Sequence, residues 1–302
     1  MTALIQGRAR VFVPFLFVLG LGWGATQPLG KMATMTGHPP FGLIFWQLVV
    51  CVLVLGGITL ARGRRLVLTW PALRFYVIVA ILGTLVPNAT FYISVARLPS
   101  GIMSILISGV PLLAFPIALA VGIDRFSPKR LAGLVLGLAG VALIALPEAS
   151  LPDPAMAAFL PLALIGPLFY AMESVYVARF GMAGMDAIQA MFGASLTGLV
   201  LCLPITLATG QWIDPVFAWG QAEYALILSS AIHALLYAGY VWLAAQAGAV
   251  FASQASYIVT GAGVCWAMLL LGERFSPWVW LAMAVMLSGV AMVAPREGGR
   301  KA

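Results

Sequence analysis

One short motif occurs twice in this chain, each time at the start of an apolar segment. Residues 124–128 read DRFSP and residues 273–277 read ERFSP. Nine of the 22 positions from 124 to 145 are identical to their partners from 273 to 294, without a gap. Self-similarity over this length indicates two copies of one structural unit. We therefore expect residues 1–147 and 148–302 to form two related repeats.

The composition requires these repeats to lie in lipid. Hydrophobic residues make up 63% of the chain and charged residues only 8%, too few to cover a water-soluble globule of this size. Apolar stretches of about 17 to 25 residues can cross a bilayer as helices. The chain contains ten such stretches, five in each repeat, and is predicted to be an all-α integral membrane protein with helices near 11–30, 41–61, 75–96, 101–121, 131–147, 156–178, 187–209, 222–245, 249–270 and 278–294.

The basic residues predict how these helices are oriented, because positively charged loops stay in the cytoplasm. If the N-terminus is cytoplasmic, thirteen of the sixteen Lys and Arg residues fall on that side, and only Lys31, Arg97 and Arg274 fall on the other. We therefore expect both termini in the cytoplasm of a bacterium and the chain in its inner (plasma) membrane. An odd number of helices per repeat makes the second repeat enter from the opposite face, so the two repeats are predicted to be inverted.

Several functional classes fit this sequence poorly. The net charge of +7 is spread over short loops and forms no single patch, which argues against nucleic-acid binding. Cys51, Cys202 and Cys265 lie inside predicted spans without paired spacing, so we expect neither disulfides nor a metal site, and no cofactor. A membrane-embedded enzyme would need clustered catalytic groups, whereas the spans contain one histidine and one carboxylate well inside them. A facilitative, channel-like permease remains an alternative, although the sequence has no ring of charges or carbonyl filter.

Polar and aromatic side chains inside the spans form two matching stripes. Thr84, Asn88 and Tyr92 recur every fourth residue, and the repeat offset places His233 and Tyr237 at the positions of the first two. Residues four apart share a helix face. Polar groups are costly in a bilayer and tend to line cavities. The two stripes are therefore predicted to face each other near the middle of the membrane.

The next span of each repeat shows the same agreement, since Ser104 and Ser108 correspond to Ser253 and Tyr257. Helix packing or back-bonding to a carbonyl is an alternative for the small hydroxyl residues, and a neutral core imidazole is the alternative for the histidine. With additions from the first and sixth helices, the predicted substrate site consists of Trp23, Gln27, Thr84, Asn88, Tyr92, Ser108, Tyr170, Glu173, His233, Tyr237, Ser253 and Tyr257.

Glu173 is the strongest single signal for function. It lies well inside a predicted span, where an isolated carboxylate costs several kcal/mol unless it is paired or protonated. We expect it either to couple proton movement to transport or to bind a cationic group, with a structural ion pair as the alternative. Aromatic side chains facing one carboxylate suit an amphipathic or cationic metabolite through cation–π contacts and charge pairing.

The chain resembles the drug/metabolite transporter superfamily, in particular its ten-helix EamA-type members. The likeness covers nearly the whole length and is carried by Trp23-Gly24 followed by Lys31, by Pro111 in the middle of the fourth helix, and by the acidic-Arg turns before the fifth and tenth helices. Asp124 stands where the family commonly has Glu. The resemblance implies a secondary carrier that works by alternating access, often an exporter of amino acids or other metabolites. We expect a small-molecule substrate and the lipid bilayer as partners, protons as coupling ions if Glu173 couples them, and no obligate protein partner.

Two glycines are assigned to structure. Gly133 and Gly137 lie four residues apart in the fifth helix, and Ala284 and Ser288 have the same spacing in the tenth. Small residues at this spacing allow helices to approach closely in membranes. We expect these positions to form a scaffold contact.

Overall fold

The structure is a computed structural model that describes residues 2–145, 151–216, 219–247 and 255–293, and its regular structure in these ranges is helical. The elements are α1 (Thr2–Thr34), α2 (Pro40–Ala61), α3 (Trp70–Ala80), the π-helical turn η1 (Ile81–Leu85), α4 (Val86–Val95), α5 (Ser100–Ile107), α6 (Val110–Ala120), α7 (Pro128–Ala145), the 3₁₀ turn η2 (Pro154–Phe159), α8 (Leu160–Phe180), α9 (Ala187–Ala208), α10 (Gln221–Ala247), α12 (Ala255–Leu271) and α13 (Pro277–Val293).

Some of these elements join end to end into single membrane passes. α3, η1 and α4 form one pass (Trp70–Val95), α5 and α6 form another (Ser100–Ala120), and η2 continues into α8 (Pro154–Phe180). Within the described ranges, eight passes are long and apolar enough to cross a membrane, and α12 and α13 are shorter apolar helices. The prediction of ten helices, five in each half, is confirmed.

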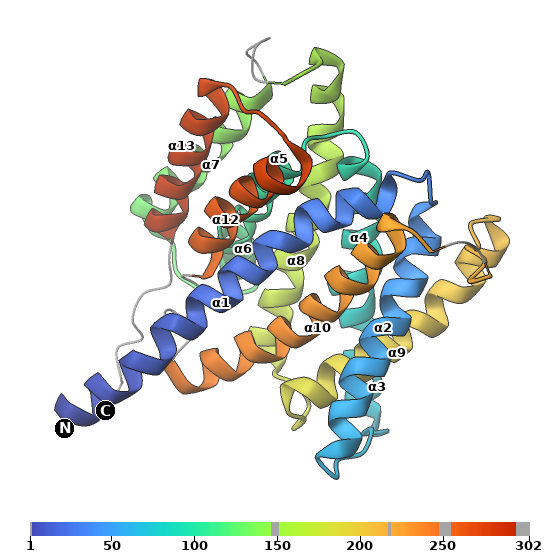
Figure 1. Ribbon diagram of the computed structural model, residues 1–302. Helices are drawn as coiled ribbons and strands as arrows, with labels where there is room; N and C mark the ends of the chain where they lie inside the picture. Colours follow the sequence, from blue (N-terminus) through green and yellow to red (C-terminus); the bar gives the residue numbers. More distant parts are fainter. Residues whose placement is uncertain (1, 146–150, 217–218, 248–254, 294–302) are drawn as a thin grey trace.

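The two halves of the chain are inverted repeats that interleave. Five passes per half bring corresponding helices through the membrane in opposite directions. α1 lies along α10 and α12 of the other half, and α2 lies along α9 (Figure 1). The predicted repeat boundary at residue 147 and the C-terminal residues 294–302, on which the predicted orientation partly depends, lie outside the described residues.

The contact between α7 and α13 is the most extensive one between helices of the two halves. The two helices lie side by side at one edge of the bundle (Figure 1). Glycines bring the backbones together: a Cβ on Gly133 would lie 2.6 Å from the carbonyl oxygen of Gly289, and a Cβ on Gly289 would lie 2.9 Å from the nitrogen of Gly137. The scaffold role predicted for Gly133 and Gly137 is confirmed.

The partner residues predicted on α13 are wrong. Ala284 and Ser288 are exposed, whereas Met286 and Gly289 are buried. A spacing of four indicates that two residues share a helix face but does not identify the face that packs. Gly289 was the better signal, because it lets two backbones touch.

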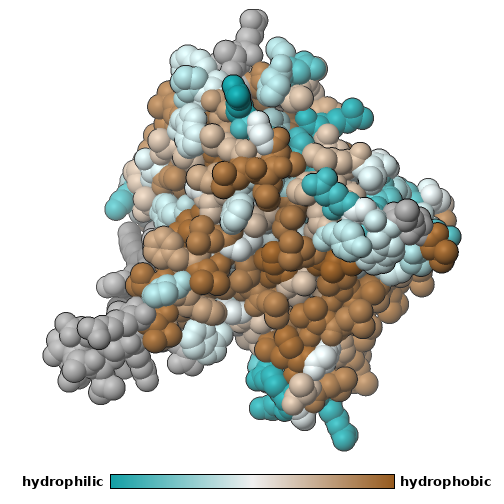
Figure 2. Space-filling model, in the orientation of Figure 1, coloured by the Kyte–Doolittle hydropathy of each residue, from teal (hydrophilic) through white to brown (hydrophobic). Residues whose placement is uncertain are grey.

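The outer surface of the bundle matches a lipid environment. Large apolar side chains in the middle of helices are exposed, among them Leu53 on α2, Val135 on α7 and Val200 on α9. In Figure 2 apolar residues cover the middle of the visible face, and hydrophilic residues gather towards its edges. In a bilayer this apolar surface contacts lipid tails, which favours the spanning arrangement.

Two interruptions shape the interior of the bundle. The π-helical turn η1 divides α3 from α4, and α5 ends at Ile107 while α6 begins at Val110. Pro87 and Pro111 follow these interruptions, and a proline cannot donate the usual backbone hydrogen bond four residues back. In a membrane such breaks are tolerated where the backbone lies inside the protein or beside a cavity.

Candidate functional site

A cavity of about 310 Å³ lies at the centre of the helix bundle. Its walls come from both halves: from α1, α2, α4, α5 and α6 of the first half, and from α8, α10 and the beginning of α12 of the second. We call it the main cavity. Residues from several helices of two inverted repeats meeting at one central space are typical of carriers whose substrate site lies between the repeats.

A second cavity of about 70 Å³ adjoins the main cavity, and we call it the Glu173 chamber. Glu173 and Thr84 line the chamber and not the main cavity. The side chains that line both spaces are those of Gln47, Asn88, Tyr170, His233 and Tyr237, so the two cavities form one composite site.

The structure brings most of the predicted site residues together. Those on the main cavity alone are Trp23, Gln27, Tyr92 and Ser108; those on both cavities are Asn88, Tyr170, His233 and Tyr237; and those on the chamber alone are Thr84 and Glu173. Ser253 lies outside the described residues. The placement of these side chains around one space supports their assignment, while contact with a substrate remains a prediction.

Tyr257 does not line either cavity. Its ring packs against a cluster that includes Phe115 and Val290, and the neighbouring Ser256 lines the main cavity instead. One residue along a helix turns the side chain by about 100°, since a turn contains 3.6 residues. The repeat offset found the correct helix but selected a position one residue away from the cavity.

Aromatic rings form one wall of the main cavity. The Trp23 ring centroid is 5.4 Å from that of Tyr240 and 6.5 Å from those of His233 and Tyr237. His233 and Tyr237 are 6.4 Å apart, between their centroids, along α10. Such a wall binds apolar or aromatic groups and also attracts cations through the faces of the rings.

Two hydrogen bonds fix polar side chains around the cavities. The Tyr92 hydroxyl donates to Gln47 Oε1 at 2.9 Å, and the Tyr170 hydroxyl donates to Asn88 Oδ1 at 3.4 Å. Gln27 Oε1 is buried without a hydrogen-bond partner among the residues that the structure describes. Because an unsatisfied buried oxygen is costly, Gln27 is a natural acceptor for a donor on a bound molecule.

Glu173 is held against the π-helical turn of the third pass. It is 7% exposed, and a Cβ on Gly83 would lie 2.6 Å from its Cδ and both carboxylate oxygens. A side chain at position 83 would therefore push the carboxylate out of this place. Tyr170 and Glu173 lie three residues apart on α8, on the face that also carries Pro167, so that one helix face delivers an aromatic ring and the carboxylate to the site.

The charges around the site are unbalanced. Among the described residues that line the two cavities, none is a lysine or arginine, and Glu173 is the single carboxylate. Two prolines also affect the walls. Pro111 and Pro167 have no backbone N–H to donate to the carbonyls of Ile107 and Ala163, and these two residues line the main cavity. The site therefore carries one negative charge, uncompensated by a basic side chain among its described lining residues, when Glu173 is ionised.

Several lining residues were missed by the sequence analysis. Gln47 lines both cavities and Tyr240 contributes to the aromatic wall, and the main cavity also contains Thr26, Ser229 and Ser256. Gln47 had a usable signal: it is the amide side chain in the middle of α2, which is otherwise almost entirely apolar. The rule that polar residues inside a membrane line cavities applies to it as directly as to Asn88.

Comparison with known proteins agrees with this architecture. The sequence profile of the EamA-like transporter family matches residues 11–146 and again residues 158–294. Two Escherichia coli proteins, from strain K12 and from O157:H7, are both described as "Uncharacterized inner membrane transporter YedA". Each is 26% identical to this chain over 296 residues, which covers 95% of this chain and 92% of the relative.

A solved structure titled "Crystal structure of protein" superposes with a TM-score of 0.61 at 18% identity and covers 95% of this chain and 99% of its own. At this identity the likeness shows the fold alone. The two family matches together cover most of the chain, one in each half, and the family consists of transporters and not of enzymes. The chain therefore belongs to the EamA-like transporter family of the drug/metabolite transporter superfamily and is a multi-pass inner-membrane transporter.

Proposed function

We propose that the protein is a secondary carrier that moves a small organic cation, or an amino acid with an apolar side chain, across the inner membrane by alternating access. The single observation that carries this proposal is the placement of Glu173 beside an aromatic-walled cavity whose described lining contains no lysine or arginine. An ammonium group would pair with the carboxylate, and the apolar part of the substrate would lie against Trp23 and Tyr237.

The volume of the site agrees with a small metabolite. A cavity of about 310 Å³ lies at the lower end of the usual size of ligand pockets, roughly 300 to 1,000 Å³. Export is the direction that the family resemblance suggests, and we place both termini in the cytoplasm because of the charge distribution in the loops. The two repeats are taken to divide near residue 147.

Glu173 has two possible roles, which transport measurements separate. Replacing it with Gln keeps the shape and removes the charge and the titratable proton. If Glu173 couples protons, Glu173→Gln will abolish uptake driven by a pH gradient and leave exchange of substrate between the two sides intact. If it binds the cationic group of the substrate, exchange and binding will fall together.

A matched pair of ligands tests the substrate class directly. 3-Phenylpropylamine carries an ammonium group at neutral pH, whereas 3-phenylpropanol has nearly the same shape without the charge. We expect the amine to raise the thermal unfolding temperature of the purified protein more than the alcohol does, because a ligand stabilises the state that binds it. A hydrogen bond to a charged group contributes about 1.5–3 kcal/mol, so Glu173→Gln should weaken amine binding roughly tenfold to hundredfold.

Glu223→Gln provides the matched control. Glu223 lies in the first turn of α10, pairs with His38 Nε2 at 2.6 Å, and lines neither cavity. This variant should bind the amine as the parent protein does. Equal stabilisation by amine and alcohol in the parent protein, or equal effects of the two Glu→Gln changes, would contradict the proposed site. Saturable counterflow in liposomes distinguishes a carrier from a channel-like permease.

A further inference from the structure

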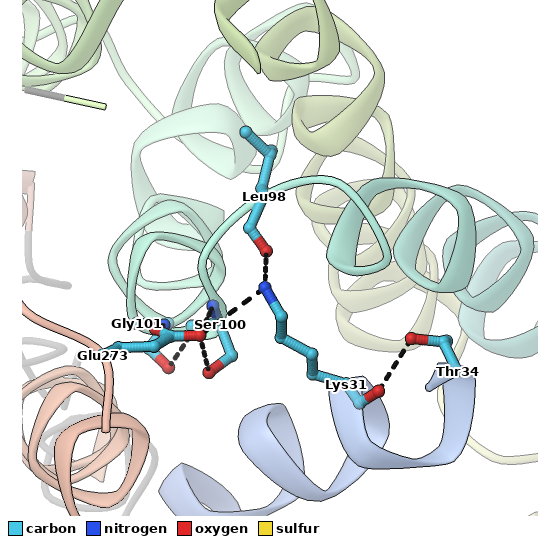
Figure 3. A network of polar contacts seen from close by, with 7 residues as sticks. Lys31, Thr34, Leu98, Ser100, Gly101 and Glu273 are labelled. Atoms are coloured by element: carbon cyan, nitrogen blue, oxygen red, sulfur yellow. Dashed lines mark hydrogen bonds and ion pairs between the residues drawn. The ribbon is translucent and has the colours of Figure 1, made fainter. Parts of the chain in front are cut away.

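A group of charged and backbone contacts joins the two halves at one end of the bundle. Lys31, near the end of α1, places its Nζ 2.7 Å from the carbonyl oxygen of Leu98 and 3.6 Å from Glu273 Oε1 (Figure 3). Leu98 lies in the turn between α4 and α5, and Glu273 lies in the turn between α12 and α13. We call this end of the bundle, where α1 ends and α5 begins, the Lys31 face.

The Glu273 carboxylate also caps the start of α5. Its Oε1 accepts hydrogen bonds from the Ser100 nitrogen at 2.8 Å and the Ser100 hydroxyl at 3.0 Å, and its Oε2 accepts one from the Gly101 nitrogen at 3.1 Å (Figure 3). A carboxylate at a helix N-terminus is favourable because free N–H groups and the helix dipole meet it there. This cap comes from the other half of the chain, so it holds the halves together as well as satisfying the helix end.

Next to these contacts, small residues allow α1, α5 and α12 to pack closely against one another. A Cβ on Gly24 would lie 2.7 Å from the nitrogen of Gly263, and Ser104 occupies the place that a Cβ on Gly263 would need. The ring of Phe275 likewise fills the place of a side chain on Gly101. The parts of α1, α5 and α12 near the Lys31 face are therefore in close contact, without room for a solute between them.

The main cavity lies on the other side of this seal. α12 lines it through Ala255, Ser256 and Val259, which lie at the end of that helix away from Glu273. α6 contributes Val110 and Pro111, beyond the break that follows α5. α12 packs along α5 but makes little contact with α6, so α12 and the fourth pass separate beyond the break, whereas α1 and α12 stay packed there, with Gly20 against Ile258.

We propose that Lys31 and Glu273 are gating residues that hold the Lys31 face closed in this conformation, and that their contacts with each other and with the start of α5 must break in each transport cycle. The inference rests on the proposed alternating-access carrier, because a carrier must open each face in turn. The corresponding acid of the first half, Asp124, instead accepts from the Arg125 nitrogen at 2.7 Å and pairs with Arg130 within its own segment.

Cysteine labelling from each side of the membrane tests the gate without knowledge of the substrate. Ile107 lines the main cavity beyond the seal, so Ile107→Cys is placed in a background in which Cys51, Cys202 and Cys265 are replaced by Ala. A membrane-impermeant maleimide is applied to oriented vesicles from either side. We expect the parent protein to react mainly from the face opposite Lys31.

Glu273→Gln keeps the size of the side chain and removes its charge, so the contacts with Lys31 and the α5 N-terminus weaken. We expect labelling from the Lys31 face to rise at least tenfold. Lys31→Met should act in the same direction, and the double variant should exceed the stronger single variant by less than twofold, because both changes break one set of contacts. Asp124→Asn is the matched control and should leave labelling from the Lys31 face unchanged.

The outcomes separate the two proposals. If the parent protein reacts from one face only and both single variants label like the parent, Lys31 and Glu273 are structural contacts and the gate is overturned, whatever the change in thermal stability. If the parent protein reacts equally fast from both faces, the Lys31 face is not held closed and the gate is overturned, while the carrier proposal stands, because a carrier opens each face in turn; that proposal fails if saturable counterflow is absent. Lys31→Met keeps the test available should Glu273→Gln prevent folding.

Discussion

The fifth helices of the two halves, α7 and α13, form one pair, and the fourth helices, α5–α6 and α12, form another. Each pair joins corresponding helices of the two repeats, yet the two pairs are built differently. α7 and α13 are unbroken and pack through glycines along their length. Their described residues line neither cavity. The pass formed by α5 and α6 is interrupted after Ile107, and both it and α12 have one part in the seal and another beside the main cavity. The fifth helices of the two halves thus form a continuous pair, and the fourth helices form the pair that we propose to open.

The physical difference between the two pairs lies in how far along the helices the close backbone contact extends. Backbone-to-backbone contacts at Gly133 and Gly289 cannot rearrange without separating the helices. Between α5 and α12 the contact of Ser104 with Gly263 is equally close, but α12 makes little contact with α6, and the break between α5 and α6 lies just beyond Ser104. The first pair suits a scaffold, and the second pair suits a gate.

Gly289→Leu tests the scaffold and should have the largest effect. Its side chain would have to displace the carbonyl of Gly133 and the backbone of Gly137. Overpacking that moves side chains costs roughly 1–3 kcal/mol and more where the backbone must shift, so we expect a loss above about 3 kcal/mol and little folded protein. The yield of monodisperse protein in detergent and its thermal unfolding measure this. Ala284→Leu, on the exposed face of the same helix, should be close to neutral, and equal losses in the two variants would refute the glycine contact.

Gly263→Ala addresses the gate pair and should have an intermediate effect. The added methyl group would overlap the Ser104 side chain, which can move if α5 and α12 separate. We expect a stability loss of about 1–3 kcal/mol together with faster labelling of Ile107→Cys from the Lys31 face. Gly261→Ala is the control, since a Cβ there meets no described atom within 4 Å. If both alanine variants label alike, the close contact at Gly263 does not hold the face shut.

The passes themselves could be predicted from the sequence because lipid imposes a length on every apolar helix. The predicted spans at 75–96 and 156–178 correspond to the passes Trp70–Val95 and Pro154–Phe180. Their ends differ by up to five residues, since polar side chains near the surface do not mark where a helix begins. The inverted arrangement followed from the odd number of helices in each repeat.

Which face of a helix points inward was harder to predict. The spacing of Thr84, Asn88 and Tyr92 located the inner face of the third pass, although Thr84 lies in a π-helical turn that no spacing rule anticipates. The repeat offset selected Tyr257, which packs outside the cavities, because small shifts between the repeats move a side chain around its helix. Gln47 belongs to no stripe and so was not predicted, although a single polar side chain in an apolar helix carries the same information.

Pro111→Ala examines the break itself and should have the smallest effect. The repeat offset places Thr260 at this position in the second half, and α12 runs through Thr260 without interruption. Alanine would restore the donor that the Ile107 carbonyl lacks and make α5 and α6 more continuous. We expect stability to change by about 1 kcal/mol or less, because a gained hydrogen bond is offset by a helix that fits its neighbours less well.

The transport rate should fall about two- to fivefold, which corresponds to roughly 0.4–1 kcal/mol in the barrier to opening. Pro116→Ala removes a proline from the exposed side of the same helix and should leave the rate unchanged. If the two alanine variants slow transport equally, the break after Ile107 has no special part in opening, and the distinction between a fixed pair and a gate pair would rest on the glycine contacts alone.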